Sequence, residues 1–212
     1  MSLHSVLLTA LLAFAPAQDV PPPETSPAAV AATSVPEVTP DELILGPIDA
    51  PVTLIAYISA ICPNCAKWHA EVLPRIIENQ IATGRIRLVL RQAPTRPAIV
   101  SEPAAGIVYC ASSDKRVDVI AALFENLPAM EEDRLSVLDW HLVGVASSGR
   151  TREEMDTCLA DTATLLAVRS VADGAIAGGA LSVPAFFVNG TLVSDDSVDG
   201  LEAAIEAAMP TG

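Results

Sequence analysis

The chain has 212 residues, enough for one domain with tails or an insertion, and 51% of them are hydrophobic, which excludes global disorder. Its 26 acidic and 12 basic side chains give a formal net charge of −14. Because so acidic a surface repels phosphate backbones, and no local cluster of Lys and Arg offsets it, nucleic acid is a poor candidate partner.

The first segment has the pattern of a targeting signal. Residues 6–15 are almost wholly apolar, as long as the hydrophobic region of a signal peptide and too short to span a bilayer. Ala15 and Ala17 are the small residues expected before a cleavage site, although the apolar run has no Lys or Arg before it. We therefore predict a signal peptide over residues 1–17 and an extracytoplasmic, periplasmic location. The alternative is an uncleaved N-terminal membrane anchor.

The next segment has the composition of a linker. Residues 18–40 contain six prolines and no aromatic residue. Such a segment cannot bury enough apolar surface to offset the entropy lost on ordering, so we predict a disordered linker. The folded domain is expected to cover residues 41–212.

A Cys-x-x-Cys motif lies between a predicted strand and a predicted helix. Residues 52–58 form a short apolar run rich in β-branched residues, which indicates a buried strand, and residues 66–81 have helical spacing. Pro74 is expected to kink or split that helix. The intervening residues are Cys62, Pro63, Asn64 and Cys65. Unpaired N–H groups in the first helical turn would stabilise a thiolate at Cys62 and lower its pKa, while Cys65 closes the disulfide.

Four cysteines in an exported protein suggest disulfide pairing, and they permit three connectivities. The simplest joins Cys62 to Cys65 and Cys110 to Cys158. Closing the long loop stabilises a fold by about 4 kcal/mol in the chain-entropy model, against about 2 for the short one. We therefore interpret the long bridge as structural and the short one as redox-active. The alternatives for the motif are a purely structural disulfide or a zinc site, for which further ligands are missing; no metal is expected.

Later segments continue the alternation of strands and helices. Residues 85–94 alternate Arg with apolar residues, which indicates a strand with one wetter face, and residues 98–171 are mainly helical in pattern. A hairpin is predicted from strands at 185–188 and 191–193 around Asn189-Gly190, followed by an amphipathic helix over 201–209. On the helix after the motif, His69 is interpreted as a surface residue, with a proton relay as the less favoured alternative.

Together these motifs resemble the DsbA-like branch of the thioredoxin superfamily, over residues 41–209. The resemblance starts from the strand–CPNC–helix segment. It is supported by the lead-in at 46–51, the next strand at 85–94, the helical stretch about 98–171 and Ser182-Val-Pro-Ala-Phe-Phe-Val-Asn-Gly190. It implies an α/β thioredoxin fold with a helical insertion. It also implies that the Val183-Pro184 bond is cis, against the motif, with the Val183 backbone pairing with substrate. Cys110 and Cys158 resemble the second, non-catalytic disulfide of some members.

The function implied is thiol–disulfide oxidoreductase activity without a cofactor. The leading prediction is oxidation of dithiols in cysteine-containing exported proteins by the Cys62–Cys65 pair, with a membrane redox partner and a monomeric protein. One alternative is a disulfide reductase or isomerase that uses the same pair. An alternative of another class is a non-redox, thioredoxin-like binding or chaperone module.

Two departures from that family affect the chemistry. Many members carry a buried glutamate on the strand before the motif, where this chain has Ala56, so proton transfer at the buried cysteine would need water or another group. The strongest oxidants of the family have His before the second cysteine, where this chain has Asn64. Asn adds no positive charge, so we expect a milder oxidant.

Overall fold

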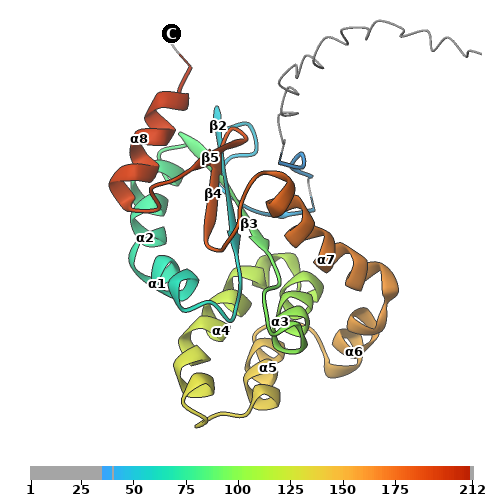
Figure 1. Cartoon of the computed structure of the whole chain (residues 1–212). Coiled ribbons are helices and arrows are strands. Elements are labelled where there is room, and N and C mark those ends of the chain that lie inside the picture. The colour runs from blue at the N-terminus through green and yellow to red at the C-terminus, as the bar shows by residue number, and fades with distance from the viewer. Residues whose placement is uncertain (1–34, 40, 211–212) are drawn as a thin grey trace, which may run out of the picture. The chain divides into compact units, whose positions relative to one another are not determined.

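A computed structural model describes residues 35–39 and 41–210 (Figure 1). The predicted signal peptide and most of the predicted linker therefore lie outside the described residues. The strands are β1 (Leu43–Leu45), β2 (Val52–Ile58), β3 (Ile86–Gln92), β4 (Ala185–Val188) and β5 (Thr191–Val193). The α-helices are α1 (Pro63–Glu71), α2 (Leu73–Ile76), α3 (Ala98–Cys110), α4 (Arg116–Glu131), α5 (Val137–Ala146), α6 (Arg152–Ala160), α7 (Thr162–Ala177) and α8 (Val198–Ala208). A π-helical turn covers Ile77–Ile81 and a 3₁₀ turn covers Ser113–Lys115.

The five strands form one mixed sheet in the order β1-β3-β2-β4-β5. β2 and β3 are parallel, with Val52 opposite Ile86 and Ile58 opposite Gln92, and every other pairing is antiparallel. Nearly every residue of β2 and β3 is buried, as expected for parallel strands covered on both faces. The β4–β5 turn has positive φ at Asn189 and Gly190, as the predicted hairpin requires.

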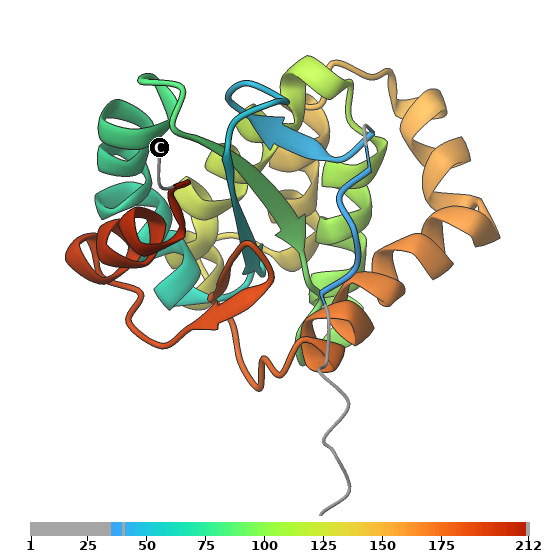
Figure 2. The ribbon, with the colours of Figure 1, turned by 90° about the horizontal axis from the view of Figure 1, so that it is seen from above.

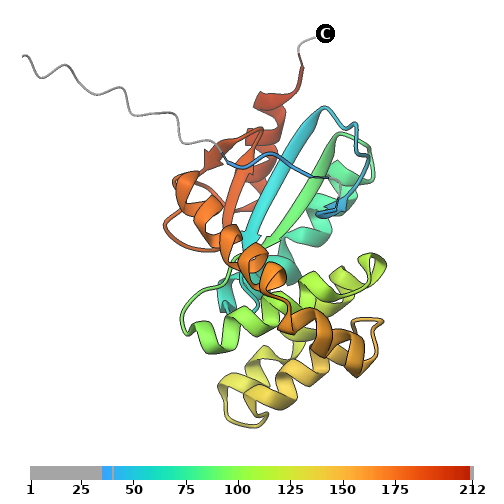
Figure 3. The ribbon, with the colours of Figure 1, turned by 90° about the vertical axis from the view of Figure 1, so that its right-hand side faces the viewer.

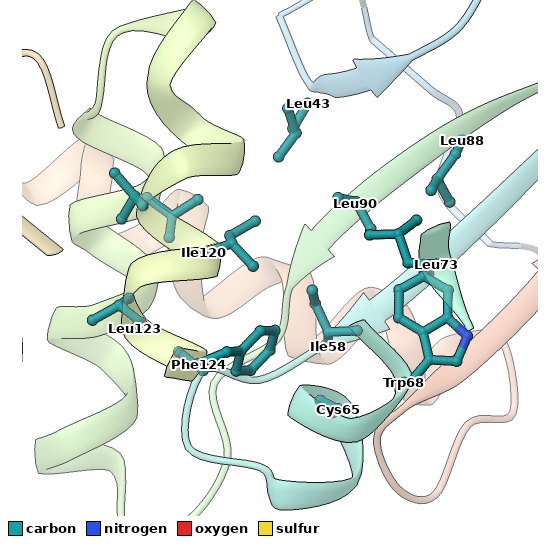
Figure 4. Close-up of a cluster of buried hydrophobic side chains, with 14 of the residues drawn as sticks. Leu43, Ile58, Cys65, Trp68, Leu73, Leu88, Leu90, Ile120, Leu123 and Phe124 are labelled. Atoms are coloured by element: carbon teal, nitrogen blue, oxygen red, sulfur yellow. The ribbon is translucent and has the colours of Figure 1, made fainter. Parts of the chain in front are cut away.

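Helices cover both faces of the sheet. In Figures 2 and 3, α2 and α8 lie on one face, and α7 lies on the other together with the segment 35–39. The larger core fills the first face and continues between β3 and the helices of the insertion (Figure 4). It brings together Ile58 of β2, Trp68 of α1 and Phe124 of α4. The motif thus lies where the sheet meets the inserted helices.

The helical insertion runs from α3 to α7, residues 98–177, close to the predicted range of 98–171. In Figure 1 the helices α3 to α6 gather below the sheet, and α7 runs beside the sheet and returns the chain to β4. No helix in the described part of the chain is long and apolar enough to cross a membrane.

The helix after the motif is broken at the expected place. α1 ends at Glu71, with Val72 as its C-cap, and α2 begins at Leu73 with Pro74 in its first turn. Pro74 has no N–H to continue the helical bonding of α1, so the axis changes direction there. Of the apolar residues at helical spacing in this segment, Trp68 and Ile76 are buried, whereas Ile77 is 40% exposed.

The start of the folded domain differs from the expected boundary at Asp41. Val35 and Val38 pack against the smaller core, on the α7 face of the sheet. Arg91 of β3, only 7% exposed, donates to the carbonyls of Pro36 and Glu37 at 3.0 and 3.1 Å. Residues 35–39 are therefore part of the domain and not of a disordered linker, because a buried guanidinium uses their backbone as acceptors.

Arg91 lies on the more polar face of β3 and is bonded there to side chains as well. Its Nε donates to the Glu42 carboxylate at 2.5 Å, and its Nη1 donates to the Tyr57 hydroxyl at 2.7 Å. At Arg91 this face of the strand therefore carries an internal ion pair with Glu42. A buried charge needs such partners because burial without them is costly.

Candidate active site

The motif lies at the end of β2, where the chain turns into α1. Cys62 is the N-cap of α1 in extended conformation, and Pro63 occupies the first helical turn. The backbone N–H of Cys65 donates to Cys62 Sγ at 3.2 Å. Helix N-terminal N–H groups and the helix dipole favour negative charge at this position. Local sequence alone thus puts the sulfur of Cys62 where a thiolate is stabilised.

The two thiols of the motif are free and differ in environment. Cys62 is partly exposed, whereas the side chain of Cys65 is fully buried in the larger core. A hydrogen bond from the Cys65 thiol, helped by the backbone N–H groups of Cys65 and Asn64, lowers the pKa of Cys62 to about 7. Burial, and then the neighbouring Cys62 sulfur, raise the pKa of Cys65 well above its ordinary value. At neutral pH, thiolate therefore forms at Cys62 and not at Cys65.

Asn64 acts through its backbone. Its side chain is exposed, and its N–H is one of the groups that lower the pKa of Cys62. Because the contribution comes from the main chain, any residue except proline could make it at this position.

The segment before β4 faces the motif. The Val183-Pro184 peptide bond is cis, and the Val183 carbonyl oxygen lies 3.6 Å from Cys62 Sγ. Sequence separation between these two residues is 121, so only the fold brings them together. β4 enters the ladder at Ala185, opposite Tyr57, which leaves the backbone of Val183 outside the sheet pairing.

Sequence reasoning missed a buried hydroxyl network beside the motif. Ser59 is 1% exposed and its hydroxyl lies 2.9 Å from that of Thr95. The N–H of Thr95 donates to Ser101 Oγ at 3.1 Å, and a second cis bond, Arg96-Pro97, follows. Serines and threonines far apart in sequence carry no periodic signal, so no local pattern could have found this network.

Position 56 offers no ionisable group. Ala56 is fully buried within the larger core, opposite Leu90 and Phe186.

His69 differs from its expected place on the helix surface. Its ring centroid is 5.3 Å from that of Phe124, and its Nε2 atom is buried. The side chain is half-buried against Phe124 of α4, a contact that the spacing within one helix could not reveal.

The other two cysteines form a disulfide away from the motif. Cys110, the last residue of α3, is bonded to Cys158 of α6 with a Cα–Cα distance of 6.0 Å. The structure therefore brings Cys62, Cys65 and Val183 together and leaves this bridge in the inserted helices.

The chain matches the family model described as thioredoxin over residues 38–207. It belongs to the thioredoxin family.

Two solved structures of DsbA type share its fold. The alpha-DsbA1 of Wolbachia pipientis has a TM-score of 0.66 at 22% identity, covering 81% of this chain and 92% of that one. BdbD of Bacillus subtilis, in its oxidised form, has a TM-score of 0.68 at 19% identity, covering 84% and 97%. The predicted thioredoxin fold with a DsbA-like helical insertion is confirmed.

A curated relative from Rickettsia bellii, named "Putative protein-disulfide oxidoreductase", is 27% identical over 176 residues. The match covers 80% of this chain and 65% of that protein. A relative from Rickettsia prowazekii with the same kind of name is 25% identical, with 80% and 62% covered. The chain thus spans less than two thirds of the length of these relatives.

Proposed function

We propose that the protein is a thiol–disulfide oxidoreductase that oxidises dithiols in cysteine-containing exported proteins through Cys62 and Cys65. The observation that carries the proposal is the contrast between the two thiols. Cys62 is accessible and has a pKa of about 7, whereas Cys65 is buried and has a raised pKa. One sulfur is thereby suited to exchange with another protein, and the other to closing the bridge. The names of the relatives agree with this chemistry.

Oxidation of a substrate proceeds in two exchanges. A substrate thiolate attacks Cys62 Sγ of the disulfide form, and Cys65 leaves with the electron pair of the broken bond and takes up a proton. A second substrate thiolate then attacks the substrate sulfur of the mixed disulfide, and Cys62 leaves as a thiolate. The substrate loses two electrons, and both cysteines of the motif are left reduced.

The backbone of Val183 is proposed to hold the substrate chain. Its carbonyl already contacts Cys62 Sγ, and its backbone precedes the first ladder residue of β4. An extended peptide could therefore pair with the Val183 backbone as an added strand, and this pairing would place the substrate sulfur beside Cys62. Pro184 holds this segment in place at the start of β4.

The direction of the reaction has a second candidate. Reduction or isomerisation of disulfides would use the same residues, with the Cys62 thiolate as the attacking group. A pKa of about 7 is near the value of thioredoxin and far above about 3.5 for DsbA. This favours a mild oxidant and keeps a reductase or isomerase as the alternative.

The cellular setting is proposed from the sequence. Residues 1–17 would direct export and be removed, residues 18–34 would act as a spacer, and the domain from residue 35 would act as a periplasmic monomer. A membrane redox partner would reoxidise the dithiol. Cleavage would be tested by N-terminal sequencing of the protein recovered from cells; an intact Met1 would favour the membrane anchor.

The reduction potential of the Cys62–Cys65 pair, equilibrated in glutathione buffers, tests the proposed direction. A potential above about −180 mV would place the protein among the oxidants, and one near about −270 mV among the reductases. Trp68 provides an optical signal, because it lies in α1 one turn from Cys65 and contacts Phe186 at a centroid distance of 4.9 Å. A protein that keeps its function after Cys62→Ser would instead be the non-redox binding module.

A further inference from the structure

The proposed function leaves one proton without an acceptor. When the dithiol form is reoxidised, Cys62 attacks the disulfide of the partner, and Cys65 must then lose its proton before it can attack the resulting mixed disulfide. Cys65 is fully buried, and burial raises its pKa. The strand beneath it carries Ala56, which cannot accept a proton. A nearby base would remove this obstacle.

His69 is a candidate that the mechanism has not yet used. It follows Cys65 by four residues within α1, so the two side chains share one helix face with Cβ atoms about 5–6 Å apart. Phe124 of α4 packs on the His69 ring with a centroid distance of 5.3 Å. Phe124 also belongs to the core that contains Cys65 (Figure 4).

One ring nitrogen of His69 is available to accept a proton. Its Nε2 atom is buried and has no hydrogen-bond partner among the described residues. Buried polar atoms are nearly always paired, with protein or with ordered water, so an unpaired one requires an explanation. A proton acceptor, which needs a lone pair held ready near the donor, provides one.

The charges around His69 favour its neutral form. Burial lowers the pKa of His69, and the Glu125 carboxylate on α4 offsets part of that effect. On α1 itself, Lys67 and Glu71 form an exposed pair at 4.0 Å. Arg75 of α2 is exposed, and β4, which meets α1 through Phe186, carries no titratable side chain. Neutral imidazole can accept a proton, whereas imidazolium cannot.

We propose that His69 is the proton acceptor for Cys65, directly or through one water molecule. The proton moves from Cys65 Sγ to His69 Nε2 while the sulfur electron pair forms the bond to Cys62 Sγ. The partner sulfur leaves Cys62 with the electrons of the mixed disulfide. In the opposite direction His69 returns the proton to Cys65 as it leaves. The inference rests on the proposed function and adds a residue to the exchange in which the bond between Cys62 and Cys65 forms or breaks.

Oxidation of the reduced full-length protein by oxidised glutathione separates the two exchanges. Attack by Cys62 forms a glutathione adduct, and attack by Cys65 releases it; acid quenching and mass spectrometry follow both species. In His69→Gln we expect adduct formation within about twofold of the wild type and adduct release at least about tenfold slower at neutral pH. Lys67→Gln, an exposed change on the same helix, is the matched control and should alter neither rate.

The pH profile distinguishes proton transfer from packing. With His69 present, adduct release should level off once the imidazole is neutral; in His69→Gln it should keep rising with pH, because the proton then passes to hydroxide. An unchanged profile shape, or an equal slowing of both exchanges, would overturn the proposal. Failure of oxidised glutathione to convert the reduced wild type to the Cys62–Cys65 disulfide would instead reject the proposed function.

A measurement on the wild type covers the case in which His69→Gln does not fold. The chain has three histidines, so the ring nitrogens of His69 can be followed by NMR during a pH titration. The pKa of His69 should differ between the dithiol and disulfide forms, because only the dithiol form has the Cys65 proton beside it. An identical pKa in both forms would contradict the proposal.

Discussion

The molecule has two pairs of cysteines, and the surroundings of the two pairs differ. Cys62 and Cys65 lie at a strand–helix junction, where backbone N–H groups and a facing carbonyl meet one partly exposed sulfur. Cys110 and Cys158 join two helices of the insertion across a sequence separation of 48. The loop-closure model gives about 4 kcal/mol for the long bridge and about 2 for a four-residue ring. Reactivity therefore follows the placement of the motif at a helix start, and stabilisation follows loop length.

The largest expected effect comes from removing the accessible sulfur. Cys62→Ser should abolish oxidation of a reduced model protein, because no other group can form the mixed disulfide with substrate. Thiol-oxidation rates with a reduced peptide substrate would measure this, with the paired change Cys110→Ala and Cys158→Ala as the control. Activity retained in Cys62→Ser would remove the distinction between the two pairs.

Removing the long bridge should affect stability and leave the chemistry of the motif intact. In the variant with both Cys110→Ala and Cys158→Ala, we expect the free energy of unfolding to fall by about 2–4 kcal/mol. Denaturant titration measures the change, and the alkylation rate of Cys62 should stay the same. A large change in that rate would mean that the inserted helices control the motif.

Removing the buried sulfur should weaken the thiolate at Cys62. The hydrogen bond from Cys65 is the main cause of the lowered pKa. In Cys65→Ala the pKa of Cys62 should therefore rise from about 7 towards its ordinary value, and mixed disulfides with substrate should accumulate. Alkylation rates measured against pH test the expected rise in the pKa of Cys62. Mass spectrometry of the adducts tests the expected accumulation of mixed disulfides. An unchanged pKa would assign the stabilisation to the backbone N–H groups alone.

The smallest effect is expected at the exposed position within the motif. In Asn64→His, a cationic imidazole near Cys62 should lower the thiolate pKa and make the pair more oxidising, by about 30 mV for each tenfold change in equilibrium. Redox equilibrium with glutathione measures the shift, and Asn64→Gln serves as the uncharged control. Equal potentials in the two variants would exclude a charge effect at this position.

Local patterns in the sequence predicted much of the fold and the motif. The strand over 52–58, the break at Pro74 and the turn at Asn189-Gly190 follow from hydrophobic periodicity and from backbone preferences. The helix start at Cys62 could be predicted because strand, proline and helix are contiguous in the sequence.

Features that depend on distant residues could not be predicted in this way. Arg91 pairs with Glu42 across 49 positions, and its bonds to the carbonyls of Pro36 and Glu37 hold the segment before Asp41 in the domain. The short edge strand Leu43–Leu45 forms only by pairing with β3. His69 is half-buried and its ring contacts Phe124 of α4, a contact that a periodic pattern within one helix does not contain.

Thiolate titration of the reduced protein tests the central claim, the difference between Cys62 and Cys65, most directly. Ultraviolet thiolate absorbance would be followed against pH in the wild type and in Cys62→Ser. The account predicts one thiolate that titrates near pH 7 and disappears in Cys62→Ser, with Cys65 still protonated where an ordinary thiol has ionised. Two thiols that titrate together near the ordinary value of about 8.5, or a low pKa that persists in Cys62→Ser, would contradict it.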